Sequence, residues 1–94
     1  LSPEYNGSVT PSFINAIAWI TRCCGDNWRD AFVQKPAVLG THSGGGGQYA
    51  LSAMLEQLSF IGMNIIGRKL LTNYSKPLNE EAAQQALNEL VKLA

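Results

Sequence analysis

The sequence is poor in the features that mark several classes of protein. Charged residues make up only 15% of the 94 residues, and seven basic side chains are balanced by seven acidic ones. This balance argues against a nucleic-acid-binding protein, which usually carries a basic surface. No apolar run is long enough to cross a bilayer. No charged segment followed by a hydrophobic one opens the chain, so we expect neither a membrane span nor a signal peptide.

Histidine and cysteine are also scarce, and we therefore expect no metal centre. His42 is the single histidine, and the two cysteines, Cys23 and Cys24, are adjacent in the chain. Neighbouring cysteines rarely pair with each other, and these two lack the C-x2-C spacing of a zinc site. Without a disulfide framework, a reducing cytoplasm is the expected compartment. Nor does the chain show a catalytic group, because no carboxylate is placed to orient His42 beside Ser43.

Hydrophobic residues, by contrast, make up 46% of the chain and follow an alternating pattern of helices and strands. Apolar positions with helical spacing predict three helices, at residues 11–22, 48–61 and 79–94. Thr10 and Asn79 are expected to cap the first and the last helix, and Lys92 suits the negative end of the last one. The expected inner faces, in chain order, are Phe13, Ile17 and Ile20, then Leu51, Leu55, Leu58 and Ile61, then Ala83, Leu87, Leu90 and Val91. Two short apolar runs, at residues 36–41 and 63–67, predict parallel strands, because a strand covered on both faces is continuously apolar. Residues 70–77 contain several turn-forming residues and are expected to form a loop. The pattern predicts an α/β fold.

Two loops in this pattern contain residues suited to contacting a ligand. The first, Pro3-Glu4-Tyr5-Asn6-Gly7-Ser8, leads into the first helix, and its Asn-Gly pair is a strong turn signal. The second, residues 42–48, contains four consecutive glycines and follows the first predicted strand, at the edge where open α/β sheets bind ligands. Its backbone N–H groups precede a helix N-terminus with a partial positive charge. On local physics alone, both stretches are most often plain connecting loops.

The glycine-rich stretch matches neither of the two common nucleotide-binding motifs. It lacks the Gly-Lys-Ser/Thr of a P-loop, and Tyr49 stands at the third glycine position of the dinucleotide fingerprint. Its ligand class therefore cannot be assigned from these motifs.

The first loop and the helix after it resemble the NADPH-dependent FMN reductase family, which has a flavodoxin-like fold. Two positions differ from the family pattern, since Ile14 stands where the family usually has lysine and Ala18 where it usually has an acid. The positions that match the family are Pro3, Glu4, Tyr5, Asn6, Gly7, Ser8, Asn15, Ala16, Ile17 and Trp19.

The resemblance implies a three-layer α/β/α fold of which this chain is only a part. Residues 1–94 would correspond to the C-terminal half of one flavodoxin-like domain, with its last two parallel strands and three helices. The family's Gly-Ser-x-Arg phosphate loop belongs to the N-terminal half and does not occur in this sequence. We therefore expect the chain by itself to be inactive as an enzyme.

The resemblance also implies that the two loops face the ring of bound FMN. Hydride would pass from NADPH or NADH to FMN and on to a small acceptor, without a catalytic side chain and without a metal. Ile14 and Ala18 would contact another subunit in a homodimer or homotetramer, or would be buried within the same chain. The implied cofactor-binding residues are Pro3, Glu4, Tyr5, Asn6, Gly7, Ser43, Gly44, Gly45 and Gly46.

Two alternatives to an FMN reductase remain at this point. A flavodoxin-type electron carrier would be strongly acidic, whereas this chain has a net charge of zero. A flavodoxin-like fragment could also serve as a non-catalytic interaction module that binds no flavin. All flavin-binding interpretations require the two loops to meet at the same edge of the sheet.

Overall fold

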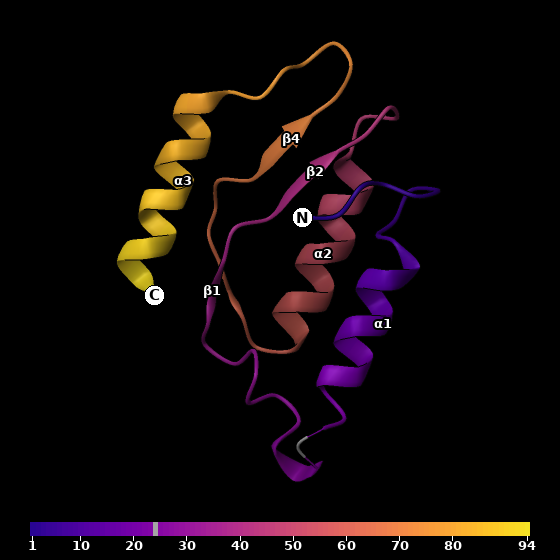
Figure 1. Cartoon of the computed structure of the whole chain (residues 1–94), viewed down its shortest axis with the longest axis vertical. Coiled ribbons are helices and arrows are strands. Elements are labelled where there is room, and N and C mark those ends of the chain that lie inside the picture. Colours follow the sequence, from indigo (N-terminus) through magenta and orange to yellow (C-terminus); the bar gives the residue numbers. More distant parts are fainter. Residues whose placement is uncertain (24) are drawn as a thin grey trace.

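The computed structural model describes residues 1–23 and 25–94 and has an α/β architecture with three α-helices and short parallel strands (Figure 1). The expectation that Cys24 does not pair with its neighbour lies outside the described residues. In chain order the elements are α1 (Pro11–Ile20), the 3-10 turn η1 (Gly25–Asn27), β1 (Pro36–Ala37), β2 (Gly40–His42), α2 (Gln48–Phe60), β3 (Asn64–Ile65), β4 (Leu70–Thr72) and α3 (Glu80–Leu93).

The four strands form two short parallel pairs, in each of which a strand from residues 36–42 pairs with one from residues 64–72. β1 pairs with β3, and β2 pairs with β4. Between the pairs, the Leu70 N–H donates a hydrogen bond of 2.9 Å to the Leu39 carbonyl, so the second pair continues the first. The start of the chain lies beside β2, where the Ser2 N–H donates to the Gly40 carbonyl at 3.2 Å.

The parallel strands were predicted correctly, but the loop predicted at residues 70–77 was wrong in its first part. Leu70 and Leu71 are half-buried and extend the pairing to Thr72, where the strand ends. The sequence analysis stopped this strand at Gly67 because glycine and two basic residues follow the apolar run. The backbone crosses that interruption and resumes pairing, with Leu71 packed against the core and Leu70 lining the groove beside α3.

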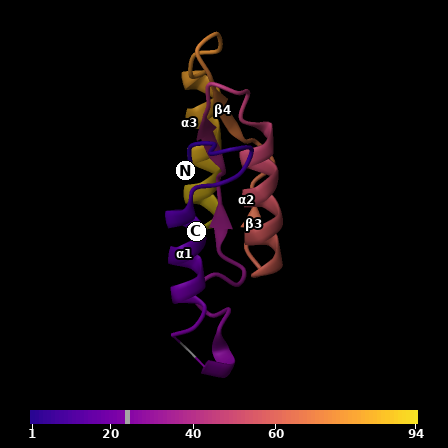
Figure 2. The same cartoon turned by 90° about the vertical axis from the view of Figure 1, so that its right-hand side faces the viewer.

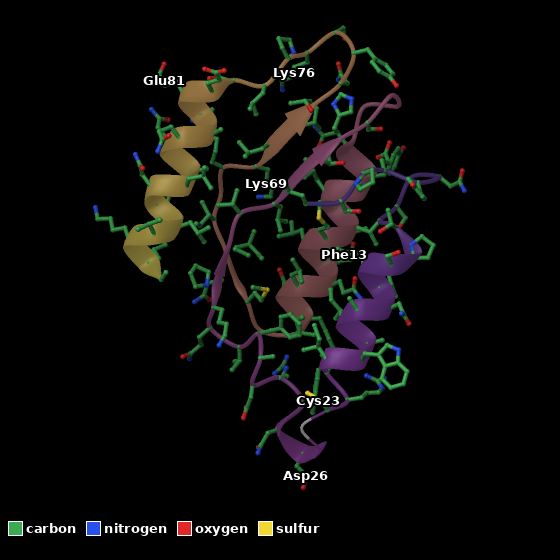
Figure 3. The ribbon with its side chains drawn as sticks, in the orientation of Figure 1. Phe13, Cys23, Asp26, Lys69, Lys76 and Glu81 are labelled. Atoms are coloured by element: carbon green, nitrogen blue, oxygen red, sulfur yellow. The ribbon has the colours of Figure 1, made fainter. Side chains whose placement is uncertain are left out.

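The start of α1 follows the sequence signals, whereas its end comes earlier than predicted. The Thr10 hydroxyl accepts a hydrogen bond from the Phe13 N–H at 3.2 Å, and Pro11 occupies the first turn, where its missing N–H costs nothing. Its last residue is Ile20, and Thr21 is the C-cap. Phe13 points from α1 toward α2, as Figure 3 shows, and packs against the core.

The core lies between α1, α2 and the strands. Met54 at its centre is only 1% exposed, whereas Leu55, which the sequence placed on the inner face of α2, is 37% exposed. Leu51, Leu58 and Ile61 are buried as predicted. The buried face also includes Ala50 and Met54, which together with Leu58 are spaced four residues apart and fall on one side of the helix. The buried apolar cluster consists of Val9, Ile17, Leu39, Leu51, Met54, Leu58 and Ile61, with Trp28 and Phe32 packed against it.

The C-terminal end of α2 is held by a residue from the segment after α1. The Arg29 guanidinium donates a hydrogen bond to the Phe60 carbonyl at the last turn of the helix. It also lies over two aromatic rings, 5.1 Å from the centre of Trp28 and 5.8 Å from the centre of Phe60. A cation at this position complements the partial negative charge of the helix end, which has no basic residue of its own.

The last helix, α3, flanks the strands on the side opposite α2 (Figure 2). Its ends carry the predicted signals: the Asn79 side chain accepts a hydrogen bond from the Ala82 N–H at 3.0 Å, and Lys92 lies in the last turn. The predicted inner face was correct only in part: Ala83 and Leu90 are half-buried, but Leu87 and Val91 are exposed, and the buried residues are Ala82 and Ala86. Among the described residues, no helix combines the length and apolar character that a bilayer span requires.

Candidate functional site

The carboxyl ends of β2 and β4 lie side by side and begin the candidate site. The Ser43 N–H donates to the Thr72 carbonyl at 3.0 Å, which joins the residue after β2 to the last residue of β4. Three segments gather around this edge, and we call them together the rim. They are the turn at residues 3–8, the glycine loop with the first turn of α2 at residues 43–50, and the turn at residues 73–76.

The turn at residues 3–8 is a tight hairpin that packs against the start of α2. Tyr5 and Ser8 exchange two backbone hydrogen bonds of 2.8 and 3.0 Å. Between them, Asn6 and Gly7 have φ angles of 51° and 75°, as a type I′ turn requires. Only 3.8 Å separates the Tyr49 Cβ from the point where a Cβ on Gly7 would lie. The first loop and the helix after the second loop are therefore in contact.

The two loops are also joined by side-chain hydrogen bonds. The Ser43 hydroxyl donates to Glu4 Oε1 at 2.8 Å, across 39 positions of sequence. The Ala50 N–H donates to Glu4 Oε2 at 3.1 Å, and the Gly45 N–H donates to Ser43 Oγ at 2.9 Å. The structure thus brings the two loops of the sequence analysis to one edge of the sheet.

Glu4 provides the cap that α2 lacks in its own sequence. The residue at the N-cap position, Gly47, has no side chain to accept a hydrogen bond, and the first turn contains no acid. Hydrogen bonds from the Ser43 hydroxyl and, next, the Ala50 N–H lower the pKa of the Glu4 carboxyl from its ordinary value of 4.5, while desolvation opposes them. The sequence suggested that this positive helix end would be open to a ligand, but the protein's own carboxylate occupies it.

The path of the glycine loop depends on Gly47. Its φ of 86° lies in the left-handed region, and an added Cβ would lie 2.8 Å from the Thr41 methyl carbon. Thr41 is buried beneath the loop, and its hydroxyl has no hydrogen-bond partner among the described residues. The loop therefore approaches β2 more closely than any other residue type would allow.

All three tyrosines of the chain lie on the rim and are exposed. Their exposed fractions are 56% for Tyr5, 72% for Tyr49 and 89% for Tyr74. The ring edge of Tyr74 lies 3.0 Å from the point where a Cβ on Gly44 would be, and it meets the His42 ring at 5.7 Å in a T-shaped contact. The sequence analysis identified only Tyr5. The signal for Tyr74 was its place after the second parallel strand, because the carboxyl ends of parallel strands share one edge.

His42 is engaged within the protein and does not project freely from the rim. Its Nδ1 lies 2.7 Å from the Thr72 hydroxyl, and its ring contacts Tyr74. The first contact joins the ends of β2 and β4, and the second joins β2 to the turn at residues 73–76, where Lys76 lies (Figure 3). Lys76 and Asn73 close this turn with a pair of backbone hydrogen bonds.

The predicted cofactor-binding residues fall into two groups, those described by their side chains or contacts and those that keep an unpaired backbone N–H. Glu4 and Ser43 bond to each other, and Pro3 lines an apolar groove of about 670 Å³ between the strands and α3. Tyr5 presents its exposed ring, and Gly45 is bonded to Ser43. Within the described part of the chain, four of the predicted residues keep a backbone N–H without a hydrogen-bond partner: Asn6, Gly7, Gly44 and Gly46.

The rim fits a planar group that carries hydrogen-bond acceptors on its edge. Both loops keep backbone donors without a partner among the described residues, and the glycine loop borders open space at Gly46, where an added Cβ would meet no atom within 4 Å. The isoalloxazine ring of FMN has this shape and these acceptors. The residues present suit the ring better than the phosphate, because Glu4 fills the helix end where an anion would bind. The described residues contain no group of three or more side chains suited to holding a metal ion.

Comparison with known proteins agrees with the resemblance found in the sequence. No curated protein matches the chain. A family model, that of the NADPH-dependent FMN reductases, matches residues 1–76, which include the rim and both strand pairs but not α3. This confirms the predicted family and the flavodoxin-like α/β fold, and it supports a flavin reductase type of function in general. The chain therefore belongs to the NADPH-dependent FMN reductase family.

Proposed function

We propose that the rim holds the ring of FMN in an NAD(P)H-dependent FMN reductase. The observation that carries this proposal is the convergence of the two predicted loops at the carboxyl ends of parallel strands, joined by the Ser43–Glu4 hydrogen bond of 2.8 Å. When bound, FMN would supply the redox chemistry by taking hydride from the nicotinamide and passing electrons to a small acceptor.

The chain's own groups would bind and orient this ring. Backbone N–H groups of Asn6 and Gly7 from one loop, and of Gly44 and Gly46 from the other, would donate to acceptors on the ring edge. The exposed Tyr5 ring would lie against the flavin and keep water from that face. No side chain needs to transfer a proton in this scheme, which agrees with the absence of an acid–base pair in the sequence.

We further propose the setting in which this site works. On the strength of the resemblance, residues 1–94 form the C-terminal half of a flavodoxin-like domain, whose other half supplies the phosphate loop, in a cytoplasmic homodimer or homotetramer. In support of a subunit contact, Ile14 is exposed on α1 and lines, with Trp28 and Phe60, a groove of about 720 Å³.

Flavin binding by this chain is the first test. Titration of the chain into FMN and into riboflavin, followed by flavin fluorescence, is expected to show saturable quenching with similar affinities for both. The affinities should be similar because the rim contacts the ring and not the phosphate. Tyr5→Ala should weaken both, whereas Val91→Ala, a substitution on the exposed side of α3, should change neither. Absence of saturable quenching would refute a flavin site.

The reductase step is tested in the protein that contains the whole domain. With bound FMN, we expect loss of NADPH absorbance that depends on an added electron acceptor, and Tyr5→Ala should slow it. Flavin that stays oxidised in the presence of NADPH or NADH would instead identify an electron carrier.

A further inference from the structure

The side chain of Glu4 directs both of its oxygens at the second loop and at α2. Oε1 accepts from the Ser43 hydroxyl at 2.8 Å, and Oε2 accepts from the Ala50 N–H at 3.1 Å. Ser43 is buried, and its oxygen also accepts from the Gly45 N–H at 2.9 Å. The carboxylate is thereby bonded to residues on both sides of the glycine tract.

Both side-chain oxygens of Glu4 thus already accept a hydrogen bond from the protein. Its neighbours Asn6 and Gly7 each keep a backbone N–H without a hydrogen-bond partner among the described residues. Glu4 can therefore affect a ligand mainly through the positions of the two loops. Glu4 lies in the first loop, and its partners Ser43 and Ala50 lie before and after the glycines of the second loop.

The glycine loop needs such an anchor more than an ordinary loop does. Four consecutive glycines have the largest backbone freedom of any tetrapeptide, and ordering them costs the most conformational entropy. If the loop samples many arrangements, only a fraction of molecules can receive a planar ring, and the apparent affinity falls by that fraction.

We propose that Glu4 and Ser43 form a latch that holds the turn at residues 3–8 and the glycine loop at the separation a planar ring requires. Glu4 is then a positioning residue and makes no contact with the cofactor. The inference rests on the proposed function for the identity of the ligand, but the latch itself is a property of this chain alone.

The test uses riboflavin, which has the flavin ring but no phosphate, and compares four variants of the chain. Glu4→Gln keeps the shape of the side chain but removes its charge, and Ser43→Ala removes the hydroxyl. We expect each to weaken riboflavin binding about tenfold, and the double variant to lose less than the product of the two single effects, because both single variants break the shared Ser43–Glu4 contact. The matched control is Asn79→Ala, which removes a helix cap from α3, away from the rim, and should leave the affinity unchanged.

A second measurement separates failure of the latch from failure of the proposed function. In amide hydrogen exchange, Glu4→Gln should accelerate exchange at Ala50, and Ser43→Ala should accelerate it at Gly45, while Ala82 in α3 keeps its rate. The latch is refuted if these rates do not change, or if Glu4→Gln binds riboflavin as tightly as Asn79→Ala does. If the chain binds no riboflavin but exchange accelerates as expected, the latch stands and the flavin function is refuted.

Discussion

The two positive-φ glycines before α2 allow a quantitative test of how the glycine loop is built. Gly46 and Gly47 have φ angles of 107° and 86°, so alanine at either position would be strained. Their surroundings differ, because a Cβ at Gly47 would lie 2.8 Å from the Thr41 methyl carbon and 3.3 Å from two atoms of Leu71, whereas a Cβ at Gly46 would meet nothing within 4 Å.

The expected cost follows from these two observations. The left-handed conformation costs a residue with a Cβ about 1–2 kcal/mol, and this term applies to both substitutions. At Gly47 the methyl group must also displace buried side chains, which typically costs about 1–3 kcal/mol. We therefore expect Gly46→Ala to lower the free energy of unfolding by about 1–2 kcal/mol and Gly47→Ala by about 2–5 kcal/mol.

Urea unfolding followed by far-ultraviolet circular dichroism measures both values, and tryptophan fluorescence provides a second probe of the same transition. A domain of this length is typically stable by about 5–14 kcal/mol, so the Gly47 variant should lose a large part of its stability. Equal midpoints for the two variants would show that the close approach to Thr41 does not exist in solution and would refute the reasoning.

Three further predictions concern the core, a buried hydroxyl and the Glu4 carboxylate. Met54→Ala should lower the free energy of unfolding by about 2–5 kcal/mol, because Met54 is 1% exposed. Leu55→Ala should lower it clearly less, because Leu55 is partly exposed, and chemical denaturation of the two variants compares the losses. Thr41→Val should stabilise the chain by about 1 kcal/mol, because it removes a buried hydroxyl that has no partner among the described residues, and a lower melting temperature would contradict this. Because the pKa of Glu4 is lowered on folding, its contribution to stability is complete above its ordinary value of 4.5 and is lost as the pH falls through the lowered value. The melting temperature, measured at a series of acidic pH values, should therefore fall less steeply with decreasing pH for Glu4→Gln than for the wild type.

The sequence predicted the parts of this fold whose signals lie close together in the chain. Caps such as Thr10 and Asn79, and the Asn6-Gly7 turn, are local patterns, and each lies where it was expected. The inner faces of α2 and α3 were assigned less well, because they depend on what each helix meets. Leu87 is as apolar as any core residue, yet it is 47% exposed and lines the groove between α3 and the strands, whereas Ala86 is 1% exposed.

The candidate site was predicted in its location but not in its internal contacts. The resemblance identified both loops, and parallel strands bring their ends to one edge. No short-range signal could show that the Glu4 carboxylate caps a helix that begins more than forty residues later. Tyr49 and Tyr74 were missed for a related reason, because each lies in a segment that has no ligand-binding pattern of its own and reaches the rim only through the tertiary fold.

The way in which α2 is capped has a consequence for the order of folding. Both of its ends are completed by residues from outside the helix, Glu4 at the start and Arg29 at the finish, whereas α3 carries its own cap and end charges. A synthetic peptide of residues 48–60 should thus be largely random coil in water, while one of residues 79–94 should retain some helicity. During folding, α2 becomes stable only when the segments around it have docked, so the central helix of the core is among the last elements to gain its full stability.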